Sequence, residues 1–221
     1  MPLAALLFDI DGTLADSNEL HVDVWDQVFR AHELSVSREA IHSQVGKGAD
    51  KLVPALVPDA DAETVKALGE EHGAIFKREH LAEVRPFPKA HELLRRAHEA
   101  GVRVVLASSA SRDEVEHYLD LLEARDLVDA TTTADDVGAS KPAPDIFSLA
   151  LERAGTPADQ TLAVGDSPYD AEAAGKCGVA AIGFRSGGFS DETLLGAGVK
   201  RLYDDAAAML ADFDQVLRGE L

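Results

Sequence analysis

The chain of 221 residues is poor in cysteine, in aromatic residues and in basic charge. Cys177 is its only cysteine, so no disulfide can form within the chain, and a reducing compartment, the cytoplasm, is expected. Lys and Arg number 21 against 40 Asp and Glu, which gives a formal net charge of −19. A field of that sign disfavours nucleic acids and anionic membranes as partners. An anionic ligand would therefore need a locally positive pocket.

Long apolar runs and internal repeats are also missing. No stretch approaches the roughly 20 apolar residues of a transmembrane helix. Asp9 interrupts the first apolar run before the core of a signal peptide could form. The apolar fraction of 46% nevertheless suits one large α/β domain, or a core domain with a smaller inserted one. We expect a cytoplasmic monomer.

The most informative stretch runs from Leu6 to Ser17, where an apolar run ends in two carboxylates and a Gly-Thr turn. The segment from Leu3 to Phe8 is short and has no polar face, which predicts a strand buried on both sides of a parallel sheet. Asp9 and Asp11 then lie on the same side of the strand end, and Gly12 lets the backbone turn close to a ligand. At about 4 Å and an effective dielectric of about 20, two such carboxylates repel by roughly 4 kcal/mol. The pair therefore indicates a cation between them, or one protonated Asp used as an acid.

Two simpler interpretations of this stretch compete. Asp-x-Asp-Gly also begins EF-hand calcium loops, but that pattern needs a glycine at position six and a glutamate at position twelve. Here Gly12 is fourth, and no Glu follows at the required place. An ordinary polar strand end is the other alternative. We favour a site for chemistry, because ligands of open α/β sheets bind where such strands end.

The remainder of the chain divides into a helical insertion and an alternating part. Leu20, Val24 and Val28 recur at helical spacing, and the segment is predicted to stay helical to about Val84, with no convincing strand between Ala15 and Arg85. Beyond it, helices alternate with apolar strands, which predicts a parallel sheet with helices on both faces. The expected strands are 102–107, 128–133, 161–164, 179–184 and 199–203, and the expected helices are 90–100, 112–123, 145–154 and 206–217.

Three more predicted loops carry polar groups. Ser108 follows an apolar run, and its hydroxyl could hold a phosphate oxygen, although a Ser there is commonly a turn residue. Lys141 lies in a proline-rich stretch just before a predicted helix, and it could neutralise a phosphate, although a lone lysine is usually a surface charge. Asp166 ends the strand 161–164, and Asp170 follows in the first turn of the next helix, where the dipole favours an anion. Aspartates from two strand ends suit an octahedral magnesium site.

These four stretches, in this order, resemble the four motifs of the haloacid dehalogenase superfamily of aspartate-nucleophile phosphohydrolases. The match runs from Leu3 to about Phe184, and the helical insertion resembles the small cap domain of phosphoglycolate phosphatase and beta-phosphoglucomutase. The resemblance implies an α/β fold with a Rossmann-like, doubly wound parallel sheet core and an inserted all-helical cap. The core would comprise residues 1–15 and 86–221, and the cap residues 16–85.

The resemblance also implies a role for each motif. Asp9 would be the nucleophile that forms an aspartyl-phosphate, and Asp11 would protonate the leaving alcohol and then activate water. The charge of Asp9 is expected to keep Asp11 protonated before metal and substrate arrive. Magnesium would be held by Asp9, Asp166 and the carbonyl oxygen of Asp11, with Asp170 ligating directly or through water. The phosphoryl oxygens would be bound by Ser108, Lys141 and the backbone amides around Gly12 and Ser109.

Four residues of the insertion are candidates for contact with the leaving group. His21 and Trp25 lie one turn apart on its first predicted helix, although an aromatic stripe at this period also packs a helical core. Gly46 and Lys47 begin a predicted cap loop that faces the crevice, and Lys47 is a candidate for a remote charge on the substrate.

The predicted function is that of a magnesium-dependent phosphatase acting on a small-molecule phosphate monoester, such as a sugar phosphate or a phosphoglycolate-like compound. The mutases of this family carry an arginine where this chain has Ala49, and Glu-Asp where it has Gly165-Asp166. Both departures favour a phosphatase over a beta-phosphoglucomutase-type mutase, although the mutases share the His21 and Trp25 spacing. A catalytically idle magnesium or phosphate sensor is a third reading, which four intact motifs disfavour. The presence of Asp11 argues against a true dehalogenase.

Overall fold

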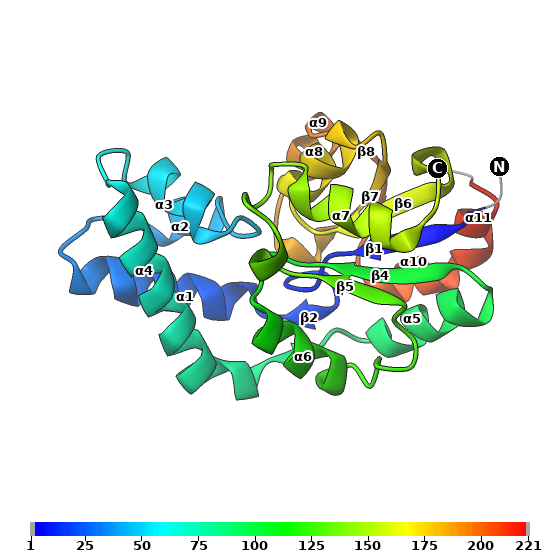
Figure 1. Ribbon diagram of the computed structural model, residues 1–221, viewed down its shortest axis with the longest axis horizontal. Helices are drawn as coiled ribbons and strands as arrows, with labels where there is room; N and C mark the ends of the chain where they lie inside the picture. Colours follow the sequence, from blue (N-terminus) through cyan, green and yellow to red (C-terminus); the bar gives the residue numbers. More distant parts are fainter. Residues whose placement is uncertain (1–2, 220–221) are drawn as a thin grey trace.

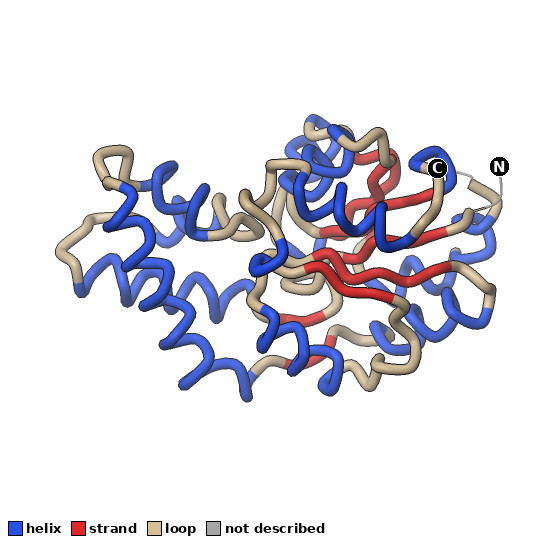
Figure 2. Tube along the Cα trace, in the orientation of Figure 1, coloured by secondary structure: helices blue, strands red, loops and turns tan. Residues whose placement is uncertain are grey.

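The computed structural model describes residues 3–219, and its centre is a six-stranded parallel sheet (Figure 2). The strand order is β5-β4-β1-β6-β7-β8, so the chain adds strands on one side of β1 and then on the other. The strands are β1 (Ala5–Phe8), β4 (Arg103–Ala107), β5 (Ala130–Thr132), β6 (Thr161–Gly165), β7 (Ala180–Phe184) and β8 (Val199–Tyr203). This order confirms the predicted Rossmann-like, doubly wound sheet.

Helices cover both faces of the sheet because successive strand residues point to opposite sides. Leu6 and Phe8 of β1 belong to one buried apolar cluster, and Ala5 and Leu7 belong to another. The first cluster is closed by α5 (Ala90–Glu99), α6 (Arg112–Leu121), α10 (Ala206–Ala211) and α11 (Phe213–Leu217), and the second by α7 (Asp145–Ala154), α8 (Pro168–Lys176) and α9 (Asp191–Gly196). Among the described residues, no helix combines the length and the apolar character needed to cross a membrane.

The insertion after β1 is helical and lies beyond one end of the sheet, at the left of Figure 1. Its elements are α1 (Asn18–Ala31), α2 (Arg38–His42), α3 (Ala49–Leu56) and α4 (Ala62–Ile75), continued by a π-helical turn (Phe76–His80) and a 3-10 turn (Leu81–Glu83). We propose that residues 16–85 form the cap domain and residues 1–15 and 86–221 the core. Positions 1, 2, 220 and 221 of that core lie outside the described residues.

Two details differ from the sequence-based expectation. A short antiparallel ribbon, β2 (Ala15–Asp16) with β3 (Arg85–Pro86), joins the insertion to the core, so the expectation of no strand there is wrong at both ends. Strands of two residues show no periodicity that a sequence could reveal. The expected helix 206–217 is divided into α10 and α11 at Asp212, whose carboxylate accepts a 2.8 Å hydrogen bond from the Tyr203 hydroxyl.

Candidate active site

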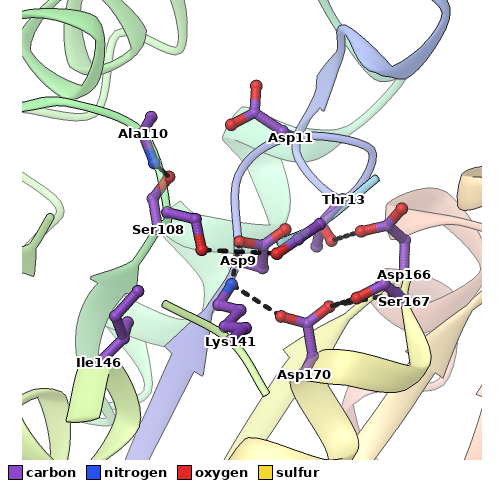
Figure 3. Close-up of polar contacts among 12 residues, drawn as sticks. Asp9, Asp11, Thr13, Ser108, Ala110, Lys141, Ile146, Asp166, Ser167 and Asp170 are labelled. Carbon is purple, nitrogen blue, oxygen red and sulfur yellow. Dashed lines mark hydrogen bonds and ion pairs between the residues drawn. The ribbon is translucent and has the colours of Figure 1, made fainter. Parts of the chain in front are cut away.

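The predicted site residues come from the carboxyl ends of four neighbouring strands. Asp9 follows β1, Ser108 follows β4, Asp166 follows β6, and Lys141 lies on the loop between β5 and α7. Because β5, β4, β1 and β6 are adjacent and parallel, their carboxyl ends meet at one edge of the sheet. Figure 3 shows Asp9, Lys141, Asp166 and Asp170 close together at this edge.

The Lys141 ammonium is fully buried between two carboxylates. Its Nζ forms an ion pair with Asp9 and lies 2.7 Å from Oδ1 of Asp170 (Figure 3). Burial alone would lower the pKa of Lys141, but the charges of Asp170 and Asp9 raise that pKa above its usual value. Lys141 is therefore a permanent positive charge beside Asp9.

Two hydrogen-bond donors that the sequence analysis did not identify hold the Asp166 carboxylate. Thr13 Oγ1 and Asn18 Nδ2 each donate a 2.9 Å hydrogen bond, one to each carboxylate oxygen. Burial and the charge of Asp170 raise the pKa of Asp166 to about 7, although the two donors oppose this shift. Gly12 has φ +76°, and a Cβ there would overlap the Asp166 carboxylate, so only glycine fits this turn.

The buried carboxylates form a cluster that could bind a metal ion. Ligand oxygens of Asp9, Asp166 and Asp170 all lie within 4.8 Å of one another. Burial raises the pKa of Asp9 well above its usual value; Lys141 opposes this shift and the neighbouring carboxylates add to it. In the described residues, Oδ1 of buried Asn18 has no hydrogen-bond partner. Excess buried negative charge with hard oxygen donors fits a divalent cation such as magnesium.

Asp11 stands apart from this cluster, and in Figure 3 its side chain points away from Asp9. Its Oδ1 accepts 2.6 Å hydrogen bonds from the hydroxyls of Ser17 and Tyr118, and His21 Nε2 lies 3.3 Å away. Sequence reasoning did not identify Tyr118, because this residue lies on α6 among apolar residues at helical spacing and resembles a core residue.

The hydrogen bonds to Asp11 overturn one expectation. Burial raises the pKa of the Asp11 carboxyl, but the three donors, His21 first, lower it to about 2. The prediction that the charge of Asp9 keeps Asp11 protonated is therefore wrong for this arrangement. Donors that bind the charged form of a carboxyl favour its ionisation.

A cavity of about 260 Å³ lies between Asp9, Asp11 and the helical insertion. All four predicted cap residues line it, namely His21, Trp25, Gly46 and Lys47. Ser109 also lines this cavity. Its neighbour Ser108 is fully buried, and the Ser108 hydroxyl accepts a 3.0 Å hydrogen bond from the amide of Ala110 (Figure 3). The cavity is small for a ligand site, which favours a small molecule.

Three rings of the insertion, those of His21, Trp25 and His72, line this cavity. Trp25 stacks on His72 with ring centres 4.3 Å apart, and His21 stacks on Phe76 at 3.9 Å. His21 Nδ1 also lies 3.4 Å from Nε2 of His72. Burial lowers the pKa of His72 well below its usual value, so this imidazole is neutral. His72 lines the cavity, and sequence reasoning did not identify it.

The predicted cap loop lies against the loops of the core. The amide of Gly48 donates a 3.0 Å hydrogen bond to Ser140 Oγ, next to Lys141 in the chain. Lys47 Nζ lies 4.2 Å from the centre of the Tyr169 ring and donates to the side chain of Gln44. Within residues 3–219, Lys47 has no carboxylate in salt-bridge range, and burial lowers its pKa.

The site thus combines a buried carboxylate paired with lysine, a cluster of carboxylates that could bind a metal ion, and an adjoining cavity. Comparison with known proteins identifies the family. Residues 3–178 match the model of the haloacid dehalogenase-like hydrolases. The chain therefore belongs to this family. It is 30% identical to protein CbbY of Cereibacter sphaeroides over 94% of each chain. It is 28% identical to a phosphoglycolate phosphatase of Rhodospirillum rubrum, over 93% of this chain and 88% of that protein.

Solved structures agree with this placement. A hydrolase from Pseudomonas syringae has a TM-score of 0.90 at 29% identity, over 96% of this chain and 99% of that one. A provisionally assigned beta-phosphoglucomutase from Bacteroides vulgatus has a TM-score of 0.89 at 22% identity, over 100% of this chain and 90% of that one, which shows a shared fold alone. The predicted family, fold and hydrolase class are confirmed. The phosphatase names among the relatives support phosphoric monoester hydrolysis as the class of reaction.

Proposed function

We propose that this protein is a magnesium-dependent phosphatase that hydrolyses a small-molecule phosphate monoester through an aspartyl-phosphate on Asp9. The observation that carries the proposal is the pairing of Asp9 with the buried ammonium of Lys141, beside a cavity of about 260 Å³. This pair combines a nucleophile with a permanent positive charge for the phosphoryl group. A sugar phosphate or a phosphoglycolate-like compound is the proposed substrate class.

Residues of the core would hold the metal and the phosphate. Magnesium would be held by Asp9, Asp166 and the carbonyl oxygen of Asp11, with Asp170 ligating directly or through water. The ion would supply positive charge at the phosphoryl oxygens. The same oxygens would be bound by Lys141, Ser108, and the backbone amides around Gly12 and Ser109.

Two proton transfers by Asp11 accompany the chemistry. In the first step an Asp9 oxygen bonds to phosphorus, the bond to the leaving oxygen breaks, and Asp11 gives that oxygen a proton. In the second step Asp11 takes a proton from water, whose oxygen bonds to phosphorus as the bond to Asp9 breaks. The ionised resting state of Asp11 suits its role as base. The acid role needs a proton, which the approach of an anionic phosphate favours by raising the pKa of Asp11.

The cavity supports hydrolysis over a mutase reaction. A mutase must shield its phospho-enzyme from water while the substrate turns around, which requires a strong anchor for the remote phosphate. Across residues 3–219, no arginine lines the cavity, and Ala49 stands on its wall. We assign the leaving group to the insertion side, where His21, Trp25 and Gly46 line the cavity and Lys47 offers a cation.

Phosphate release from a panel of sugar phosphates, phosphoglycolate and nucleoside monophosphates tests this function. We expect release that depends on magnesium, stops with a chelator and returns with added metal. Full activity in excess chelator would contradict the metal site. Beta-glucose 1-phosphate with a trace of its bisphosphate tests the mutase alternative, because stoichiometric glucose 6-phosphate without free phosphate would overturn hydrolysis. Phosphate binding with neither product would indicate a sensor.

A further inference from the structure

Three donors converge on a single oxygen of Asp11. The hydroxyls of Ser17 and Tyr118 both lie 2.6 Å from Oδ1, and His21 Nε2 lies 3.3 Å from it. A length of 2.6 Å is typical of a hydroxyl that donates to an ionised carboxylate. Within residues 3–219, Oδ2 of Asp11 accepts no hydrogen bond. Asp11 lines the cavity, and its side chain is 16% exposed. One oxygen is therefore fixed and the other is available to a ligand.

The donors belong to different parts of the molecule. Ser17 directly precedes α1 and His21 lies on it, so both belong to the start of the insertion. Tyr118 lies on α6, which packs on the sheet, and it is 107 residues from Asp11 in the chain. The Tyr118 side chain is fully buried. Tyr118 is thus the hydrogen-bond donor to Asp11 that comes from the core and not from the insertion.

We propose that Tyr118 is a positioning residue for Asp11, which holds Oδ1 so that Oδ2 faces the reacting oxygen in the cavity. This inference rests on the proposed function, in which Asp11 transfers protons. A short hydrogen bond from a rigid, buried ring restricts the carboxylate to one orientation. Proton transfer depends on such placement, because small displacements from the reactive geometry are costly to the rate.

Tyr118→Phe tests the proposal, since it removes the hydroxyl and keeps the ring. We expect kcat for an alkyl phosphate to fall about 10-fold with KM unchanged within about 2-fold. This loss is smaller than the roughly 10² to 10⁴-fold that general acid–base catalysis contributes, because Asp11 itself remains. In single-turnover measurements, release of the leaving group from an activated aryl phosphate, which needs no proton, should change less than about 2-fold. In an Asp11→Asn background the same substitution should have no further effect on either substrate, because the two residues act as a unit.

Tyr203→Phe is the matched control. The Tyr203 hydroxyl also donates to a carboxylate, Asp212, at 2.8 Å, but neither residue lines the cavity. This variant should leave both substrates unaffected. Thermal unfolding of both Tyr→Phe variants separates a loss of stability from a loss of rate. A crystal structure of Tyr118→Phe adds a readout that needs no activity, and we expect the Asp11 carboxylate to occupy a new or a second orientation.

The outcomes separate this inference from the function on which it rests. If Asp11→Asn slows leaving-group release from alkyl and aryl substrates equally, the acid role of Asp11 is overturned, and the role of Tyr118 with it. If Asp11→Asn distinguishes them and Tyr118→Phe does not, only the role of Tyr118 is overturned. A loss in Tyr118→Phe that persists in the Asp11→Asn background, or an unmoved Asp11 carboxylate in the crystal structure, would also refute the positioning role.

Discussion

The two sides of the cavity differ in how closely their polar groups are paired. We call the side formed by residues of the core the core wall, and the side formed by residues of the insertion the insertion wall. On the core side the charged groups have close partners, as in the 2.7 Å ion pair of Lys141 with Asp170 and the two 2.9 Å hydrogen bonds to Asp166. On the insertion side His21 makes longer contacts, of 3.3 and 3.4 Å, and Lys47 lies outside salt-bridge range of any described carboxylate. In the proposed mechanism the core wall would hold charges in place for the reaction, and the insertion wall would offer polar groups to the leaving group. Changes to the core wall should therefore affect every substrate alike, and changes to the insertion wall should affect substrates selectively.

The largest effect is expected at the core wall, from Asp9→Asn. The substitution keeps the shape of the side chain but removes the proposed nucleophile, so turnover should fall by at least about 10⁴-fold for every phosphate ester. Acid-quenched protein should carry no covalent phosphate by intact-mass measurement, whereas the unaltered chain should carry it. A variant that still hydrolyses some esters at near-normal rates would show that Asp9 is not the nucleophile.

A smaller and uneven loss is expected from Asp11→Asn, which lies where the two walls meet. The proposed nucleophile, Asp9, remains, but both proposed proton transfers are lost, so hydrolysis of alkyl phosphates should fall by about 10² to 10⁴-fold. An activated aryl phosphate should lose less in its first step. Single-turnover measurements of alcohol release and phosphate release separate the two steps. Equal losses with both leaving groups would exclude Asp11 as the acid.

The parts of the site that the sequence predicted share a local cause. Asp9, Ser108 and Asp166 each follow a buried apolar strand, and adjacent parallel strands bring such residues together whatever the details of packing. The helical insertion could also be predicted, because its apolar residues recur at helical spacing. The ribbon formed by 15–16 and 85–86 was missed because strands of two residues have no period.

The parts that were missed depend on contacts between distant segments. Tyr118 lies 107 residues from Asp11, and Asn18 lies 148 residues from Asp166, so no local pattern joins them. His72 meets His21 across 51 residues. The wrong protonation state of Asp11 has the same origin, because the prediction counted the neighbouring charge of Asp9 and could not count the donors that the fold brings to Asp11.

At the insertion wall, Lys47→Met should weaken binding without slowing the chemistry. We expect KM to rise about 10-fold for esters whose leaving group carries a second anionic group, with kcat within about 2-fold, because this change removes a binding interaction made equally in ground and transition states. Esters with neutral leaving groups should be unaffected. Lys51→Met is the matched control, since Lys51 is exposed, pairs with Asp50 at 3.6 Å and does not line the cavity. A uniform loss across substrates would contradict the division between the two walls.

The smallest effect is expected from Gly73→Ala, which should raise the stability of the protein and weaken the binding of esters with bulky leaving groups. Gly73 lies on α4 and lines the cavity, and a Cβ there would meet no heavy atom within 4 Å. Alanine in a helix interior is more stable than glycine by about 0.5–1 kcal/mol, so the unfolding midpoint should rise by about 1–4 °C. The added methyl group narrows the cavity, so KM should rise a few-fold for bulky leaving groups and stay constant for the smallest ones.

Gly175→Ala is the matched control for Gly73→Ala. Gly175 lies on α8, a Cβ there also meets no heavy atom within 4 Å, and the residue does not line the cavity. The unfolding midpoint of this variant should also rise, within the lower half of the range given for Gly73→Ala, because Gly175 lies near the end of its helix. Its KM should be unchanged for every ester. If both variants raise KM for bulky esters, a general stiffening of the protein explains the effect. If Gly73→Ala is more stable and leaves every KM unchanged, the space beside α4 is not where the leaving group binds, and selectivity must come from the loop that carries Lys47.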